Sequence, residues 1–420
     1  MIALFAMIAF VTNLCTPMAT IIKNQGEISN VLAQIGNYGN FVAYLVMGIP
    51  AGMLIAKFGY KKTALIGLVV GIVGILIQWC SGLLDNGDGS NIGVVFGVYL
   101  LGAFISGLTM CILNCVVNPM LNLLGGGGNA GNQLIQIGGV FNSTAAVCCY
   151  ILMGALIADA TKAKISDATP ALMIALAIFA IAFVVILFTK IEEPEQAPVE
   201  VSLIKGAMSY RHFALGALAI FLYMGIEVGV PNYVLQYLTS GDEANGFSAI
   251  SAGVAGLLVA VYWFMMLVGR FAGAAIGSKV SSRAMVTTVS IATLALVLGG
   301  MFAPTDVLVN FPGVDWGKLE LIWQEIPVGI FLFLLVGLCT SVMWGAIFNM
   351  AVEGLGKYTA IASGIFMTMV FGCAVMMAIQ GAVADATNYI TSFWVVVFCA
   401  AYILFYALVG SRPTKKAEKE

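Results

Sequence analysis

The sequence LGAFISGLTMCILNCVVNPMLNLLG, residues 101–125, contains no charged side chain. A helix needs about 20 apolar residues to cross a bilayer, and this stretch is long enough. Its amides Asn114, Asn118 and Asn122 recur every four residues and therefore share one face of a helix. Because an unpaired amide is costly in lipid, that face must meet protein or a water-filled cavity. The stretch predicts a membrane helix that helps to line a polar interior.

The composition of the whole chain also indicates a membrane protein. Of its 420 residues, 61% are hydrophobic and 9% are charged, whereas soluble domains are about 25% charged. The 48 glycines suit close packing of membrane helices. A net charge of −2 without a basic patch excludes a nucleic-acid partner. The nine cysteines and the single histidine form no pattern typical of a disulfide framework or a metal site, so we expect no metal and no cofactor.

Hydropathy predicts an all-α polytopic fold with twelve transmembrane helices. Fourteen of the 18 Lys and Arg residues lie on one side of the membrane if the N-terminus is inside. Because basic residues collect in cytoplasmic loops, we expect both termini in the cytoplasm. The expected spans are 1–22, 31–57, 61–82, 93–124, 130–158, 170–189, 212–239, 247–277, 283–303, 326–352, 357–384 and 388–410.

The longest charged connection divides the chain into two parts. It reads TKIEEPEQAPVEVSLIKGAMSYRH, and its Pro and Glu content is typical of a linker. We expect an N-terminal six-helix bundle at 1–190, a cytoplasmic linker at 191–211, and a C-terminal six-helix bundle with a short cytoplasmic tail at 212–420. Two parallel halves of this kind are typical of a transporter whose site lies at the midplane between them.

Several strings occur in the order expected for a known family. They are GIPAGMLIAKFGYKK, NPMLNLLG, VFNSTAA, FLYMGIEVGVPNYVLQYL, VGRFAGAAIG and WGAIFNMAVEGLGKYTAIASG, and they extend from the second to the eleventh span. Together they resemble the fucose:proton symporter family, the monosaccharide permeases of the major facilitator superfamily with its two pseudo-symmetric six-helix bundles. The resemblance implies a multi-pass permease of the bacterial inner (cytoplasmic) membrane. Such a permease moves a sugar such as fucose, galactose or glucose by alternating access, with a proton as the usual driving ion.

The sequence departs from that family at two acidic positions. In the fucose-transporting branch, acids in the first and fourth spans are tied to sugar binding and proton coupling. Counting from the shared strings, these positions fall near Thr16 and on Asn114, and neither residue is acidic. The departure leaves open whether transport is coupled and which residue would carry the proton.

Polar and aromatic side chains within the spans are the candidates for sugar binding. Asn and Gln donate and accept hydrogen bonds, as sugar hydroxyls do, and aromatic rings commonly line ligand pockets. Each polar residue could instead form a hydrogen bond between helices, worth about 0.6 kcal/mol. The predicted binding residues are Asn37, Tyr38, Asn114, Gln136, Asn142, Glu227, Tyr233, Trp344 and Asn349.

Charged residues within or at the ends of spans suggest coupling and gating roles. Glu227 lies near the middle of the seventh span, with no basic residue in the surrounding run. An intramembrane acid is functional by default, so we expect Glu227 to carry the coupling proton or contact the sugar, with a structural hydrogen bond as the alternative. Lys61, Lys62 and Arg270 are expected at a cytoplasmic gate, a role that the resemblance implies for Arg270.

Four functions can account for part of these observations. A proton-coupled sugar symporter is the prediction, and a facilitative uniporter is the alternative that the missing acids favour. A membrane enzyme would need an acid, histidine or metal cluster near an interface, and a sugar sensor would need an appended signalling domain. We therefore expect a monomeric transporter and not an enzyme, with a monosaccharide, a coupling proton and the lipid bilayer as its partners.

Overall fold

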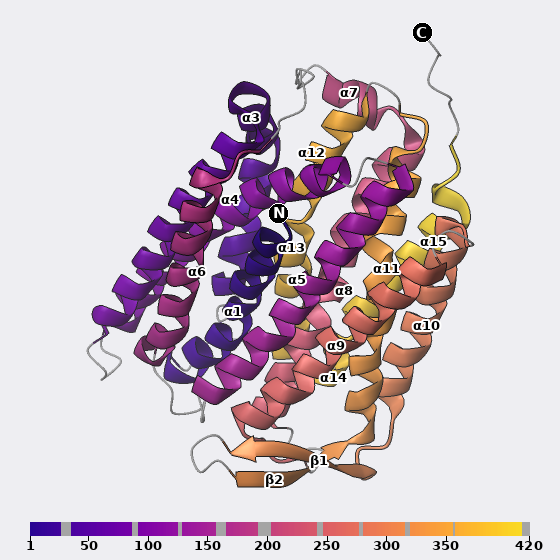
Figure 1. Cartoon of the computed structure of the whole chain (residues 1–420). Coiled ribbons are helices and arrows are strands. Elements are labelled where there is room, and N and C mark those ends of the chain that lie inside the picture. Colours follow the sequence, from indigo (N-terminus) through magenta and orange to yellow (C-terminus); the bar gives the residue numbers. More distant parts are fainter. Residues whose placement is uncertain are drawn as a thin grey trace.

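The structure is a computed structural model, and it shows a bundle of long helices with one β-hairpin at one end (Figure 1). It describes residues 1–26, 35–85, 91–124, 128–156, 165–191, 203–241, 247–276, 280–315, 320–355 and 358–413. The N-terminal helices are α1 (Ile2–Gly26), α3 (Ile35–Leu83), α4 (Ile92–Leu124), α5 (Gly128–Leu156), the 3-10 helix η1 (Ile165–Ala168) and α6 (Thr169–Phe188). The C-terminal helices are α7 (Leu203–Met208), α8 (Arg211–Ser240), α9 (Ala252–Ile276), α10 (Ser282–Phe302), α11 (Val328–Val352), α12 (Thr359–Met369), α13 (Gly372–Ala386), α14 (Tyr389–Ser392), α15 (Trp394–Phe405) and the π-helix η4 (Tyr406–Gly410).

The apolar helices agree with the predicted spans one for one. Within the described part of the chain, nine helices are long and apolar enough to cross a membrane. Three shorter apolar stretches, Ile2–Leu14, Phe41–Ile55 and Ile137–Met153, coincide with the first, second and fifth predicted spans. The all-α polytopic fold class is therefore confirmed.

Helix α3 joins two predicted spans without an intervening loop. Its backbone is non-helical only at Gly59, where φ is 80° and ψ is 173°. Residues with a side chain rarely adopt such a positive φ, and glycine adopts it readily. The connection between the predicted spans 31–57 and 61–82 is therefore a sharp kink at Gly59, followed directly by a new helix.

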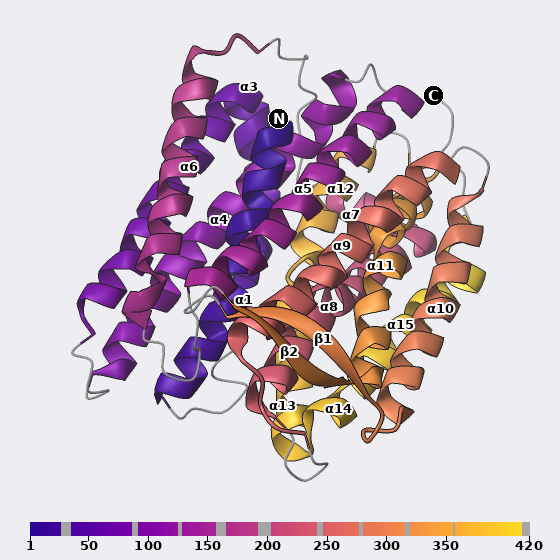
Figure 2. The same ribbon diagram turned by 60° about the horizontal axis from the view of Figure 1, so that its bottom comes forward.

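The connection between α10 and α11 contains a β-hairpin that hydropathy did not predict. Strands β1 (Leu308–Asp315) and β2 (Glu320–Pro327) pair antiparallel, with Leu308 opposite Pro327. One face packs on the bundle: the side chain of Ile326 is fully buried, and the rings of Phe311 and Phe331 lie 5.9 Å apart. The hairpin lies across the end of the bundle opposite α7 (Figures 1 and 2).

Small residues bring the helices of the bundle close together. At Gly337 of α11, an added Cβ would lie 2.2 Å from the backbone oxygen of Tyr262 in α9. Membrane helices associate by such close packing because no hydrophobic effect drives them together in lipid. The resulting contact between α9 and α11 holds Tyr262 and Arg270 of α9 in place beside α8.

Helices α5 and α9 cross each other over much of their length, and α3 packs against α12 and α13. In Figure 1 the N-terminal helices, drawn in indigo and magenta, lie beside the C-terminal helices, drawn in orange and yellow. The α5–α9 crossing is where polar side chains of the two groups meet. The division into an N-terminal bundle at 1–190, a linker at 191–211 and a C-terminal bundle at 212–420 stays a prediction.

Candidate functional site

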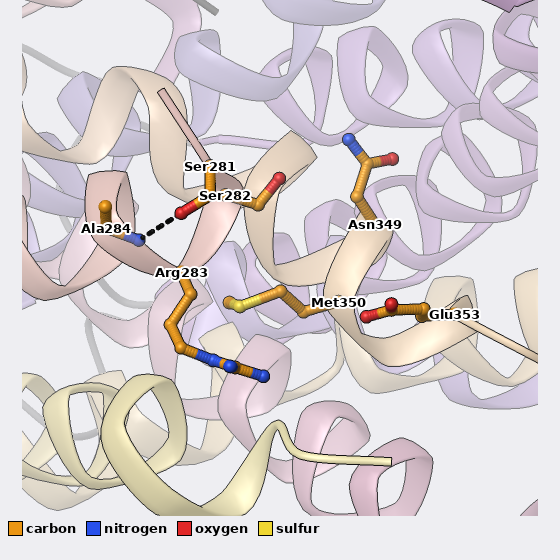
Figure 3. Close-up of a pocket in the computed structure, with 7 residues that line it drawn as sticks. All are labelled: Ser281, Ser282, Arg283, Ala284, Asn349, Met350 and Glu353. Carbon is orange, nitrogen blue, oxygen red and sulfur yellow. Dashed lines mark hydrogen bonds between the residues drawn. The ribbon is translucent and has the colours of Figure 1, made fainter. Parts of the chain in front are cut away.

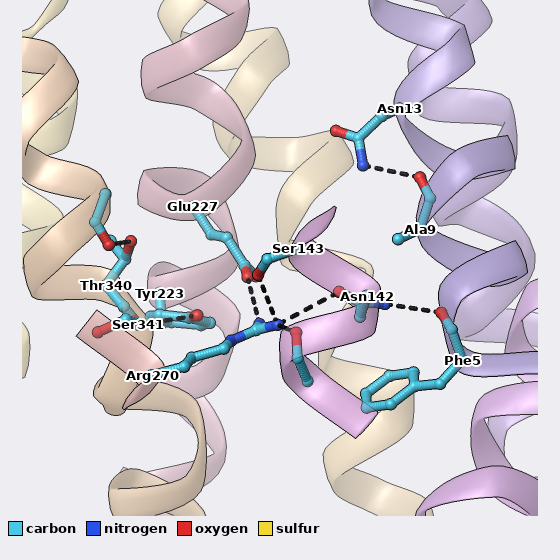
Figure 4. A network of polar contacts seen from close by, with 12 residues as sticks. Phe5, Ala9, Asn13, Asn142, Ser143, Tyr223, Glu227, Arg270, Thr340 and Ser341 are labelled. Atoms are coloured by element: carbon cyan, nitrogen blue, oxygen red, sulfur yellow. Dashed lines mark hydrogen bonds and ion pairs between the residues drawn. The ribbon is translucent and has the colours of Figure 1, made fainter. Parts of the chain in front are cut away.

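A partly buried arginine at the contact between α5 and α9 forms the centre of the polar network in Figure 4. Arg270 of α9 donates from Nη1 to the backbone oxygen of Gly139, to Ser143 Oγ at 2.8 Å and to Asn142 Oδ1 at 3.4 Å. All three acceptors belong to α5. The guanidinium therefore connects a C-terminal helix to an N-terminal helix through neutral oxygen atoms.

The other side of the same guanidinium faces Glu227 of α8. Arg270 Nη2 lies 4.0 Å from Glu227 Oε1, and the two side chains are 12% and 14% exposed. The hydroxyl of Tyr223, one helical turn earlier, is also a partner of the Glu227 carboxylate. The sequence analysis expected Glu227 in mid-membrane without a basic neighbour in its own run. The structure shows that the neighbour comes from α9.

The network continues from α5 to α1. Asn142 donates from Nδ2 to the backbone oxygen of Phe5 at 2.9 Å while its Oδ1 accepts from Arg270. Both ends of the Asn142 amide are thus engaged in contacts between helices. Of the predicted binding residues, Asn142 and Glu227 are brought together around Arg270.

Asn114 of α4 has a different partner. Its Nδ2 donates to the hydroxyl oxygen of Tyr44 in α3 at 2.8 Å. Tyr44 is buried, whereas Asn114 is partly accessible. The Asn114 position matches the acid that the resemblance placed on the fourth span.

Tyr233 and Trp344 lie in different surroundings. Tyr233 follows Glu227 by six residues, which places it about 120° away around α8. It is fully buried and donates to the backbone oxygen of Met377 at 2.7 Å. Trp344 of α11 is partly accessible, and its ring centroid lies 6.1 Å from that of Tyr223. Trp344 is therefore adjacent to the Glu227 network, whereas Tyr233 joins α8 to α13.

Asn349 lies at the far end of α11, away from this network. It is exposed and lines a cavity of about 550 Å³. Ser281 accepts a hydrogen bond from the backbone N–H of Ala284 at the start of α10, beside this cavity (Figure 3). The residues that line it are Ser281, Ser282, Arg283, Ala284, Asn349, Met350 and Glu353. Any contact of Asn349 with a sugar would occur at this end of the molecule.

The predicted gating residues Lys61, Lys62 and Arg270 do not share one set of contacts. Lys61 donates from Nζ to the backbone oxygens of Leu187 and Thr189, at 3.0 and 2.7 Å, at the end of α6. A cation at the C-terminal end of a helix is stabilised by the helix dipole. Lys62 is exposed. Lys61 thus caps α6, whereas Arg270 contacts α5.

Three predicted binding residues cannot be compared with the structure. The side chains of Asn37, Tyr38 and Gln136 lie outside its described part. The described residues contain no cluster of three or more His, Cys, Asp or Glu side chains that could hold a metal ion.

Sequence reasoning missed four participants in these contacts. Ser143 and Gly139 lie in or beside the string VFNSTAA, and Tyr223 precedes Glu227 by one helical turn. A search for partners one turn from each intramembrane charge would have found Tyr223. The contacts of Tyr44 and of the α5 residues depend on how helices that are distant in the sequence pack together. Hydropathy does not report that packing.

The chain was compared with known proteins. The family model described as Major Facilitator Superfamily matches residues 1–371. A glucose/galactose transporter of Brucella abortus is 28% identical over 416 residues, which cover 97% of this chain and 92% of the relative. The L-fucose-proton symporter of Escherichia coli is 21% identical over 438 residues, which cover 98% of this chain and 92% of the relative.

Solved structures share the fold. The crystal structure of the transporter FucP in its outward conformation superposes with a TM-score of 0.70 at 20% identity, covering 98% of this chain and 97% of that one. The D-xylose-proton symporter gives a TM-score of 0.69 at 13% identity, covering 99% and 97%. Together with the membrane helices and the family match over most of its length, these findings show that the chain belongs to the Major Facilitator Superfamily.

Proposed function

We propose that this protein is a proton-coupled monosaccharide transporter that works by alternating access. The relatives named as glucose/galactose transporter and L-fucose-proton symporter support a sugar substrate. Asn114 and Trp344 support it independently, because a partly accessible amide and a partly accessible indole within the spans can contact a sugar. The protein would act as a monomer in the bacterial inner membrane, with both termini in the cytoplasm and no enzymatic activity.

Glu227 is the observation that carries the coupling. It is an acid in the middle of a membrane helix, and its side chain is 14% exposed. A buried acid of this kind is functional by default in membrane proteins. Neither acid that the family resemblance led us to expect in the N-terminal half is present, so Glu227 is the carboxylate best placed to accept and release the proton.

The test is uptake of radiolabelled glucose, galactose and fucose into proteoliposomes with and without an imposed pH gradient. Glu227→Gln keeps the shape of the side chain and its hydrogen bonding but cannot titrate. The variant should lose gradient-driven accumulation and keep counterflow, which needs only exchange of loaded carrier. Full gradient-driven uptake by Glu227→Gln would remove Glu227 from the coupling mechanism.

The same assay separates the proposal from its alternative. A facilitative uniporter would show no accumulation under a pH gradient even in the wild-type protein. The absence of acids near Thr16 and at Asn114 favours that alternative. In a uniporter, Glu227→Gln would change only the affinity for sugar.

A further inference from the structure

Two cysteines of α4 lie one helical turn apart, on the face of the helix that also carries Asn114. Cys111 and Cys115 are four residues apart in the sequence, and Asn114 comes three residues after Cys111. Positions i, i+3 and i+4 of an α-helix share one face, so both thiols lie beside the amide. Both cysteines are free and buried, with exposures of 0% for Cys111 and 8% for Cys115.

Contacts with α3 show that these three side chains point toward the same neighbour. The Tyr44 hydroxyl accepts a hydrogen bond from Asn114 at 2.8 Å. The thiols of Cys111 and Cys115 interact electrostatically with the same Tyr44 side chain, and the Cys115 thiol is a hydrogen-bond partner of the Cys111 thiol. Helix α4 thus presents a pair of thiols next to the residue that we propose as a sugar contact.

The spacing of the two thiols decides which chemistry they can perform. Cβ atoms one turn apart on a helix are about 5–6 Å from each other. A disulfide needs about 3.5–4.5 Å between its Cβ atoms, so a direct bond between Cys111 and Cys115 would distort α4. One atom placed between the two sulfur atoms spans the larger separation, and sulfur ligands select soft elements. The pair is therefore suited to chelate a single soft atom.

We propose that Cys111 and Cys115 form a dithiol site for a trivalent arsenical, and that an arsenical bound there blocks sugar binding at Asn114. An arsenical with one organic group forms two bonds to sulfur, the number that this pair supplies. The site itself follows from the geometry of α4. The block of sugar binding rests on the proposed function.

The reaction of this site with phenylarsine oxide leaves no charge in the membrane. The first thiol adds across the arsenic–oxygen double bond, which gives one As–S bond and an As–OH group. The second thiol displaces that hydroxyl, which leaves as water with the second thiol proton, and arsenic stays trivalent. Because both sulfur atoms end in neutral As–S bonds, no thiolate remains in the bilayer interior, where a charge is costly.

The exposure of the two cysteines sets the order of these steps. Cys115 is the more exposed of the two, and its neighbour Asn114 is partly accessible, whereas Cys111 is fully buried. The first bond therefore forms at Cys115, and the bridge closes at Cys111. The phenyl group of the bridged product then lies beside Asn114 and occupies space that a bound sugar would need.

The test follows adduct formation and sugar counterflow in the same proteoliposomes, with phenylarsine oxide as the probe. Mass spectrometry of the intact protein should show one adduct that survives washing with mercaptoethanol, a monothiol. Dimercaptopropanol should remove the adduct, because it offers two thiols of its own. Counterflow should be lost as the adduct forms and should return when dimercaptopropanol removes it. Failure to form a wash-resistant adduct would overturn the site.

Single substitutions distinguish the pair from other thiols. Cys111→Ser and Cys115→Ser each leave one thiol, so the half-inhibiting concentration should rise about 100-fold, the gain that a second linked contact provides. Cys148→Ser in α5 is the matched control, because it removes an exposed thiol that also has a cysteine beside it. It should keep the wild-type response. If a serine variant does not fold, alanine at the same position replaces it.

Wild-type sensitivity in both α4 variants, or an adduct that depends on Cys148, would overturn the site. Treatment with the oxidant diamide provides a check on the spacing, and it should leave Cys111 and Cys115 reduced. A disulfide between these two cysteines, detected by peptide mapping, would contradict the separation on which the site depends.

The dithiol site and the proposed function fail in different ways. A bridged adduct that leaves counterflow unchanged would overturn the block at Asn114. A wild-type protein that transports neither glucose, galactose nor fucose would overturn the proposed function. Mass spectrometry would still decide whether Cys111 and Cys115 chelate the arsenical, because that measurement needs no sugar.

Discussion

At the scale of single residues, pairs formed across helices define the chemistry of the molecule. Asn114 and Tyr44 form one such pair, with 2.8 Å between the amide nitrogen and the hydroxyl oxygen. Tyr44 has one hydroxyl hydrogen and can both accept from Asn114 and donate elsewhere. The pair joins α3 to α4 through an amide that is partly accessible, so a ligand hydroxyl can approach it.

Asn114→Ala should weaken binding of the transported monosaccharide about tenfold, the loss expected for one or two hydrogen bonds to a ligand. Isothermal calorimetry on the purified protein measures the change. The melting temperature should stay close to that of the wild-type protein, because a hydrogen bond between membrane helices contributes only about 0.6 kcal/mol.

Tyr44→Phe is the matched control, since it removes the same pair without touching the proposed ligand contact. It should reduce affinity less than Asn114→Ala. An unchanged affinity in Asn114→Ala together with a large loss of thermal stability would show that the amide serves only to join α3 and α4.

At the scale of helices, small residues and helix ends set the arrangement that brings Arg270 to Glu227. The hydropathy pattern predicted the nine helices of the described residues that are long and apolar enough to cross a membrane, because each is a continuous apolar run. It could not predict that Glu227 and Arg270 would be partners, because that contact depends on the packing of α8 against α9. It also missed the β1–β2 hairpin, whose short strands are not apolar enough to be recognised as spans. The pattern also could not predict that Asn349 lies apart from the Arg270 network, because that position depends on packing and not on residue type.

Gly337→Ala should destabilise the protein by about 1–3 kcal/mol, as overpacking of a tight interface does. The added methyl group would lie 2.2 Å from the backbone oxygen of Tyr262, so α9 and α11 must move apart. Thermal unfolding in detergent measures the loss. Gly52→Ala in α3 is the control, because no atom lies within 4 Å of the Cβ it would add. Equal stability of the two variants would contradict the close approach of α9 to α11.

Lys61→Met should lower stability by about 0.3–1 kcal/mol, because it removes the cation from the end of α6. Lys62→Met, one residue later and exposed, should have little effect. The melting temperatures of the two variants give the comparison, and transport rates should be similar. Loss of transport in Lys61→Met without loss of stability would instead support the gating role predicted from the sequence.

At the scale of the whole molecule, the bundle has two different ends. One end carries α7, and the opposite end is crossed by the β-hairpin (Figure 1). The distribution of Lys and Arg predicts that the α7 end faces the cytoplasm. The outer face of the hairpin includes Leu321 and Trp323, which are 67% and 64% exposed.

A cysteine at Trp323 should therefore react with a membrane-impermeant maleimide added to intact cells. A cysteine at Lys62 should react only after the membrane is permeabilised. Labelling of the unsubstituted protein gives the background from native thiols such as Cys80 and Cys148, which are exposed in the structure. The reverse pattern would show that the orientation predicted from the basic residues is inverted.

The kink at Gly59 has a mechanical consequence for the transport cycle. The part of α3 before it touches the C-terminal group, where a Cβ added at Gly48 would meet Thr368 of α12. The part after it packs on α4, where a Cβ added at Gly74 would meet Ser106. Only Gly59 separates these two arms, so α3 has no loop between them that could absorb a displacement. We therefore expect a displacement at the contact with α12 to reach α4, the helix that carries Asn114.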